Sequence, residues 1–318
     1  MTNIQRRTFI FVSFFIAITF IGFFQSWNVA LGIFNLCIIS AIMALGVNIQ
    51  LGYAGIFNAG VMGFAALGGL AAVIISYPPV PETIALGGSG IFLSLVILTV
   101  GATIITIIYK STLSINIKKV TIPLSILTLI VLFNLIGSPA IESIEAFKPA
   151  ASGFLGGFGL PIILSWFVGG ILAGFVAFFI GKLTLGLRSD YLAIATLGIA
   201  EVIIYFLKNE DWLTRGVKNV NGLPRPVPYE VDLQGNAWFI EFCEKYSFPL
   251  VETSSIVVKI SYCLLFSGVL ITLFILSEIA LKSPWGRMMR AIRDNEVSAR
   301  AMGKNVKARH LELSLIHI

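Results

Sequence analysis

The chain has little charge, few cysteines and almost no histidine, and each shortage argues against a class of function. Only 12% of its 318 residues are charged, about half of the roughly 25% found in a soluble domain. Histidine occurs only at His310 and His317, which argues against a histidine-based zinc site and a Ser-His-Asp triad. The three cysteines, Cys37, Cys243 and Cys263, fit no metal-binding spacing. We therefore predict no catalytic residue, no metal and no cofactor.

The chain also lacks a nucleotide-binding loop and a cleavable signal peptide. No G-x-x-x-x-G-K-S/T segment is present, so any ATP that drives this protein must be bound by another chain. The first apolar run follows Arg6 and Arg7 without a convincing cleavage site after it, and we expect it to stay as an anchor. The pI of about 9.3 does not indicate nucleic acid, because the basic residues lie at the ends of apolar runs.

Long apolar runs are what the chain has in abundance, and they predict an all-α, polytopic bundle of transmembrane helices. We place a transmembrane domain at residues 1–281 with about eight spans. The predicted spans are residues 8–24, 29–50, 56–76, 91–109, 120–137, 161–181, 191–208 and 256–281. Loops rich in lysine and arginine alternate with poor ones, which puts the N-terminus and residues 282–310 in the cytoplasm. The polar segment 209–255 then forms a compact extracytoplasmic loop.

Three polar residues in or beside the spans are candidates for a translocation pathway: Asn48, Asn58 and Glu201. A charge in mid-membrane costs about 2.5–3.5 kcal/mol on insertion scales. Glu201 therefore either faces a watery path, where it contacts substrate or couples a proton, or bonds a polar residue of another span. The glycine-dense stretch Gly52–Gly69 has two interpretations as well, close helix packing or a helix broken within the membrane.

The most informative segment is the basic block, residues 282–310, which follows the last span. Its eight lysines and arginines outnumber two acids by six, which equals the net charge of the whole chain. Pro284 after Ser283 predicts the start of a helix. A turn near Asp294–Asn295 and a stop at Gly303 predict a second, short helix. The block is thus predicted to be a helix–turn–helix.

The predicted first helix of the basic block is amphipathic. Trp285, Met288, Met289 and Ile292 share roughly one face, and the arginines project to the other. Exposed methionine and basic side chains suit a groove on a soluble partner. The same pattern is also expected of a helix that lies on anionic lipid, and the residue pattern alone leaves both interpretations open.

Three blocks, taken in order, resemble the permease subunit of bacterial branched-chain amino acid ABC transporters, a family whose relatives move urea or short amides. The matching blocks are Asn48–Gly69, Tyr191–Ile203 with Leu213–Pro226, and Ser283–Val306, in which Glu296, Ala299 and Gly303 fit an E-x-x-A-x-x-x-G core. The resemblance implies an importer permease fold and a coupling role for the basic block. The residues expected to couple to the ATPase are Trp285, Gly286, Arg287, Arg290, Arg293, Asp294, Glu296, Ala299 and Gly303.

The resemblance also implies partners and a location. It implies a multi-pass subunit of the bacterial inner membrane that has no enzymatic activity of its own. The expected partners are a second homologous permease subunit, two cytoplasmic ATPases, an extracytoplasmic solute-binding protein and the lipid membrane, but no nucleic acid. The alternative is an ion-coupled secondary transporter that uses Glu201. Family members continue with further spans after the coupling loop, so we expect a C-terminal truncation with residues 311–318 as a truncated or non-native tail.

Overall fold

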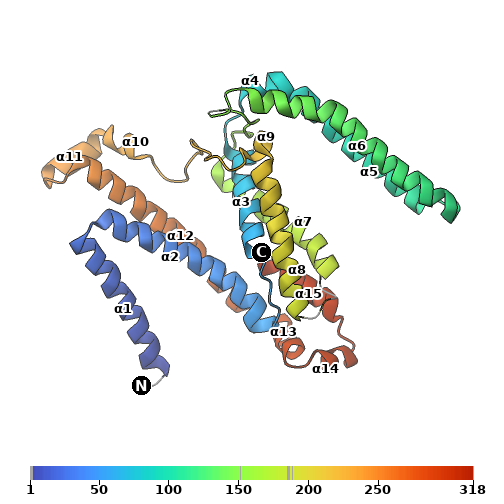
Figure 1. Cartoon of the computed structure of the whole chain (residues 1–318). Coiled ribbons are helices and arrows are strands. Elements are labelled where there is room, and N and C mark those ends of the chain that lie inside the picture. Colours follow the sequence, from blue (N-terminus) through green and yellow to red (C-terminus); the bar gives the residue numbers. More distant parts are fainter. Residues whose placement is uncertain (1–2, 151, 185–186, 188, 318) are drawn as a thin grey trace. The chain divides into compact units, whose positions relative to one another are not determined.

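The computed structural model describes the chain except residues 1–2, 151, 185–186, 188 and 318, and the described residues are almost entirely helices and short loops (Figure 1). The first half contains α1 (Asn3–Phe24), α2 (Trp27–Asn48), η1 (Ile49–Tyr53), α3 (Val61–Ser76), α4 (Pro81–Thr83), η2 (Ile84–Gly88), α5 (Ser89–Lys110) and α6 (Ile115–Ala146). The second half contains α7 (Ile162–Thr184), α8 (Ser189–Asn209), α9 (Asp211–Thr214), α10 (Glu230–Gln234), α11 (Ala237–Lys245), α12 (Leu250–Lys282), α13 (Pro284–Asp294), α14 (Glu296–Ala301) and α15 (Val306–His317). The all-α prediction is confirmed.

Seven helical segments in the described chain are long and apolar enough to cross a membrane. They are Ile4–Phe24, Trp27–Tyr53, Pro81–Lys110, Ile115–Ala146, Ile162–Thr184, Tyr191–Asn209 and Leu250–Lys282. The predicted span 56–76 differs from these, because its helix α3 begins only at Val61 and has 16 residues. At about 1.5 Å per residue this helix is roughly 24 Å long, shorter than the hydrocarbon core of about 30 Å.

The first compact unit comprises Met1–Val61, Gly174–Leu197 and Arg225–Ile318. Within it α2 and α12 lie side by side, and α1 packs against α2 (Figure 1). The short helices α10 and α11 pack against α12, and Gln234 donates a hydrogen bond to Ser254 at 2.8 Å. Part of the polar segment 209–255 is therefore a small helical insert anchored on the last long helix.

The second compact unit comprises Met62–Ala173 and Gly198–Pro224. The helices α5 and α6 form a long hairpin (Figure 1), and α6 runs on to Ala146, past the predicted span end at residue 137. A turn of the polar segment is held here by Arg215, which is buried and donates to the carbonyls of Asn219 and Ala150 at 2.6 Å each.

Small residues give α7 one closely packed face, as their spacing predicts. Gly169, Ala173, Ala177 and Gly181 recur every four residues and are all buried, whereas the adjacent Gly170 is exposed. A Cβ added to Gly169 would stand 3.4 Å from the Cα of Gly68, so the two backbones approach closely. Small residues allow this approach, which favours helix association in lipid.

Candidate functional site

The candidate site begins at a break in the helix that follows α2. The helix widens into the π-turn η1 (Ile49–Tyr53), a form of backbone often found at functional sites. Gly55 then takes φ +69°, a left-handed conformation that favours glycine. Residues 55–60 are not helical, and α3 starts at Val61. The glycine-dense stretch therefore contains a broken helix. Its glycines also allow close packing, since a Cβ on Gly60 would stand 2.6 Å from the carbonyl oxygen of Thr196 and one on Gly63 would stand 2.9 Å from the Cα of Ala200, so both features that the sequence suggested are present. We call residues 54–60 the break loop.

Two polar contacts hold the break loop. Asn58 is buried, and its Oδ1 accepts the backbone N–H of Gly60 at 2.8 Å. The N–H of Ala59 donates to Oγ1 of Thr196 on α8 at 3.1 Å. Both bonds satisfy backbone groups that a continuous helix would have paired internally, and they stabilise the irregular chain.

The basic block contains the two predicted helices with the boundaries expected from its sequence, and a third helix, α15, begins within it at Val306. Helix α13 starts at Pro284 directly after Ser283. Asn295 caps α14, because its Oδ1 accepts the N–H of Ser298 at 2.9 Å. Gly303 takes φ +77° after the second helix, as expected for a helix stop.

Helix α13 is anchored inward by its apolar face. Met289 and Ile292 are buried in a cluster with Ala54 and Ile56 of the break loop. Leu192, Val306 and Leu313 complete this cluster, and Trp285, Met288 and Ala299 pack against it. The prediction of exposed methionines on α13 is therefore wrong. The periodicity identified the apolar face, but it could not show that the break loop and α15 supply apolar surface to cover it.

Several residues of α13 contact the C-terminal carbonyls of α12. A Cβ on Gly286 would stand 2.2 Å from the carbonyl oxygen of Leu281, so only glycine fits there. Arg290 Nη2 donates to the same carbonyl at 3.4 Å, and Arg287 Nη1 donates to the carbonyl of Lys282 at 3.1 Å. Cations near carbonyls at a helix C-terminus are stabilising.

The outward surface of the block is formed mainly by α14 and the turn after it. Glu296 pairs with Arg300 one helical turn later, at 2.5 Å. Val297 and Met302 are 78% and 80% exposed, respectively, among these charges. The sequence analysis missed both residues, although an apolar side chain within a strongly polar segment was a visible signal.

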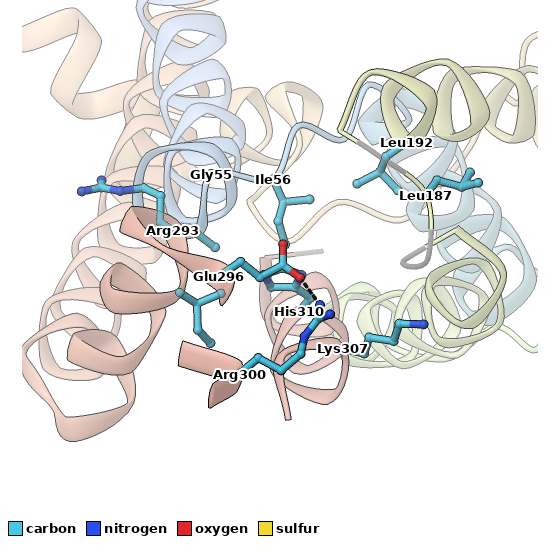
Figure 2. A pocket seen from close by; sticks show the side chains of 11 residues that line it. Gly55, Ile56, Leu187, Leu192, Arg293, Glu296, Arg300, Lys307 and His310 are labelled. Atoms are coloured by element: carbon cyan, nitrogen blue, oxygen red, sulfur yellow. Dashed lines mark hydrogen bonds and ion pairs between the residues drawn. The ribbon is translucent and has the colours of Figure 1, made fainter. Parts of the chain in front are cut away.

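A cavity of about 250 Å³ lies between the break loop and helices α13 to α15 (Figure 2). Its lining residues are Ala54, Gly55, Ile56, Leu187, Leu192, Ile292, Arg293, Glu296, Arg300, Lys307 and His310. Burial lowers the pKa of His310, and Glu296 opposes this effect. The guanidinium of Arg293 is turned away from Glu296 and His310 (Figure 2). It donates instead to the carbonyl of Gly52 at 2.5 Å and to Asp294 at 2.9 Å.

The three pathway candidates have different surroundings. Asn48 is exposed at the end of α2, ten residues before the buried Asn58. Glu201 lies on the part of α8 that belongs to the second unit, is exposed, and has no hydrogen bond or ion pair among the described residues. The structure thus shows no interhelical bond for Glu201 within the described chain.

A polar contact in the first unit was not foreseen from the sequence. Lys259 lies within α12, and its Nζ donates to the carbonyl of Asn28 at 2.8 Å. The side-chain amide of Asn35 donates to the carbonyl of Lys259 at 3.0 Å. The signal was a single lysine within an apolar run, which in a membrane span calls for a partner.

Together these features define a multi-pass membrane protein in which a basic helix pair is anchored on a broken helix. The family model described as branched-chain amino acid transport system / permease component matches residues 149–311. The chain belongs to this family.

Curated relatives agree with the family. Over 142 residues, 43% of the chain, it is 30% identical to the high-affinity branched-chain amino acid transport system permease protein LivM of Escherichia coli (strain K12). It is 29% identical over 140 residues, 42% of the chain, to LivM of Salmonella typhimurium (strain LT2). Each alignment covers 32% of the relative, so the match spans about a third of these proteins. No solved structure matches the chain.

Proposed function

We propose that the chain is the transmembrane permease subunit of an ATP-driven importer for branched-chain amino acids. The family match supports this function, because it runs without interruption from residue 149 through α14. Its matched region includes the basic block as well as the long apolar helices α7, α8 and α12. ATP hydrolysis belongs to separate subunits, since the sequence has no phosphate-binding loop.

The observation that carries the proposal is the outward surface of α13 and α14. Val297 and Met302 offer two exposed apolar side chains on α14 and the turn after it, a segment that also carries the partly exposed ion pair of Glu296 and Arg300. Interfaces commonly combine an apolar centre with a charged rim. The excess of positive charge in residues 282–310 supports a cytoplasmic location of this surface in a bacterial inner-membrane protein. We assign it to docking of a cytoplasmic ATPase, with Glu296, Ala299 and Gly303 setting the shape of the helix pair.

The remaining partners follow from the proposed assembly. An importer of this kind has a second permease subunit and a second ATPase, and the two permeases together form the pathway. The polar segment 209–255 would face the extracytoplasmic solute-binding protein. Its exposed Trp238, Val231 and Val217 provide apolar contact area at that side.

A test of the docking surface uses the chain co-expressed with its ATPase subunit. We expect the double variant Val297→Asp/Met302→Asp to lower ATPase co-purification at least tenfold, because burial of each apolar side chain contributes about 1.5–3 kcal/mol. Val217→Asp is the matched control, since Val217 is 74% exposed but lies in the polar segment 209–255. Unchanged co-purification of the double variant would contradict ATPase docking at this surface.

The pathway residues Asn48, Asn58 and Glu201 are part of the same proposal. An ion-coupled transporter that relies on Glu201 is not favoured, because it leaves the basic block without a role. In the importer, Glu201→Gln is expected to lower amino acid uptake about tenfold, the effect of a lost charged contact of roughly 1.5 kcal/mol, without releasing the ATPase. Full uptake by this variant would remove Glu201 from the pathway. ATPase-independent uptake by the wild-type protein would instead support ion coupling.

A further inference from the structure

We infer that Arg293 is a positioning residue that joins the coupling helix α13 to the broken helix, and that it does not contact the ATPase. The inference rests on the proposed importer function. It departs from the expectation that Arg293, like Arg287 and Arg290, docks on the ATPase. Its starting point is one bond, from Nη1 of Arg293 to the carbonyl oxygen of Gly52 at 2.5 Å.

The carbonyl of Gly52 is available because the helix breaks at this point. In a continuous α-helix it would accept the N–H of residue 56. The N–H of Ile56 bonds the carbonyl of Gln50 at 3.3 Å instead, and the N–H of Gly55 bonds that of Leu51 at 3.1 Å. Arg293 thus replaces a backbone donor that the π-turn removed. A charged donor forms a stronger hydrogen bond than a neutral one.

Packing holds the same two elements together. The cluster around Met289 and Ile292 includes Ala54 and Ile56, which flank Gly55 on the break loop. A Cβ on Gly55 would stand 2.9 Å from Cγ of Arg293, so the aliphatic part of the arginine lies directly against the loop. The helix α13 therefore holds the break loop through an apolar contact and a polar contact at once. A displacement of α13 must move the loop with it, because tightly packed interiors transmit displacement.

Three of the five N–H donors of the Arg293 guanidinium are already bonded within the chain. Its Nε and Nη2 donate to Oδ1 of Asp294 at 3.1 and 2.9 Å, and its Nη1 is bound to Gly52. The side chain points away from Glu296 and Arg300 of α14, whose ion pair lies in the cavity beside His310 (Figure 2). By contrast, Lys118 donates to the carbonyls of Tyr109 and Ser111 at the end of α5, at 2.9 and 2.6 Å. Lys118 lies outside the basic block and is therefore the control for the loss of one positive charge on helix-end carbonyls.

The experiment measures amino acid uptake and ATP hydrolysis in the same vesicles, with the complete importer reconstituted. For Arg293→Gln we expect uptake per ATP hydrolysed to fall about tenfold, the factor that corresponds to loss of a charged hydrogen bond, with ATPase co-purification unchanged. Arg293→Lys is expected to restore part of the uptake per ATP hydrolysed. The lysine ammonium can bond the Gly52 carbonyl, but it lacks the forked geometry of the guanidinium. Lys118→Gln is expected to leave the ratio at the wild-type value, because Lys118 lies outside the proposed docking surface and pathway.

Hydrogen exchange of the chain in detergent tests the link independently of transport. Arg293→Gln is expected to speed exchange at residues 49–60 at least tenfold, whereas Lys118→Gln is expected to leave these amides unchanged. Release of the ATPase by Arg293→Gln, or a normal uptake ratio with normal exchange, would overturn the inference. If the wild-type importer takes up no branched-chain amino acid, the proposed function fails, while the exchange measurement still decides whether Arg293 holds the break loop.

Discussion

The α5–α6 hairpin and the region around the break loop are built on different principles. In the hairpin, threonine hydroxyls bond carbonyls of their own helix, as Thr103 does with Thr99 at 3.0 Å. Around the break loop, polar groups bond across elements, as Thr196 does with Ala59 and Arg293 with Gly52. The hairpin is stabilised by hydrogen bonds within each helix and by apolar contacts between the helices. Many different sequences can provide both. The break region depends on individual side chains, and this is where the protein's function can be altered by single substitutions.

The largest effect on stability is expected from a substitution at the start of α13. Gly286→Ala places a methyl group 2.2 Å from the carbonyl of Leu281, and such overpacking against backbone should destabilise the chain by about 3 kcal/mol. Gly268→Ala in α12 has no atom within 4 Å of the added Cβ and should be neutral or stabilise by up to about 1 kcal/mol. Thermal unfolding in detergent compares the two variants. Equal unfolding temperatures would show that the α12–α13 junction is as tolerant as an ordinary helix surface.

A smaller effect on stability is expected when a threonine that contacts the break loop is compared with a threonine of the α5–α6 hairpin. Thr196→Val leaves the N–H of Ala59 without its partner, which should cost about 1–3 kcal/mol. Thr103→Val removes only a hydroxyl bonded within its own exposed helix turn and should change stability by less than about 0.5 kcal/mol. The difference in denaturant midpoint measures this contrast. If Thr103→Val lowers the denaturant midpoint as much as Thr196→Val does, the two regions do not differ in their dependence on single side chains.

The smallest expected effect is on the pH dependence of folding stability. Burial lowers the pKa of His310 in the folded chain, so the folded state binds fewer protons than the unfolded state below a pH of about 6.5. Stability contributed by neutral His310 should therefore be complete above this pH and be lost as the pH falls. His310→Gln should flatten that part of the profile. An unchanged pH profile in the variant would show that His310 does not titrate against folding.

Much of the fold follows from the sequence, because long apolar runs and helix signals are local properties. Pro284, Asn295 and Gly303 set the ends of helices α13 and α14, and Glu278 pairs with Lys282 as their spacing predicts. The burial of Met289 could not be predicted in the same way. Its covering surface comes from residues 54 and 56, more than 230 positions earlier in the chain.

The candidate site was only partly predictable for the same reason. The glycine-rich stretch indicated a broken helix as one of two possibilities, and the basic block indicated a docking element. The bond between Arg293 and Gly52 joins residues 241 positions apart, and no periodicity reveals such a pair. Lys259 was not predicted, because only acidic residues were considered as intramembrane charges. A lysine side chain in mid-membrane costs free energy in the same way as an acid does.

The tie between Lys259 and the start of α2 has a consequence for biosynthesis. Asn28 is made 231 residues before Lys259, and Asn35 is made 224 residues before it. At about 5–20 residues per second, a ribosome needs roughly 10–50 s to cover that distance. Throughout this interval the newly inserted α1–α2 pair lacks the carbonyl and the ammonium that complete its polar contacts. Helices α1 and α2 therefore reach their final pairing only after α12 has entered the membrane, so a segment made well before α12 is completed only when α12 arrives.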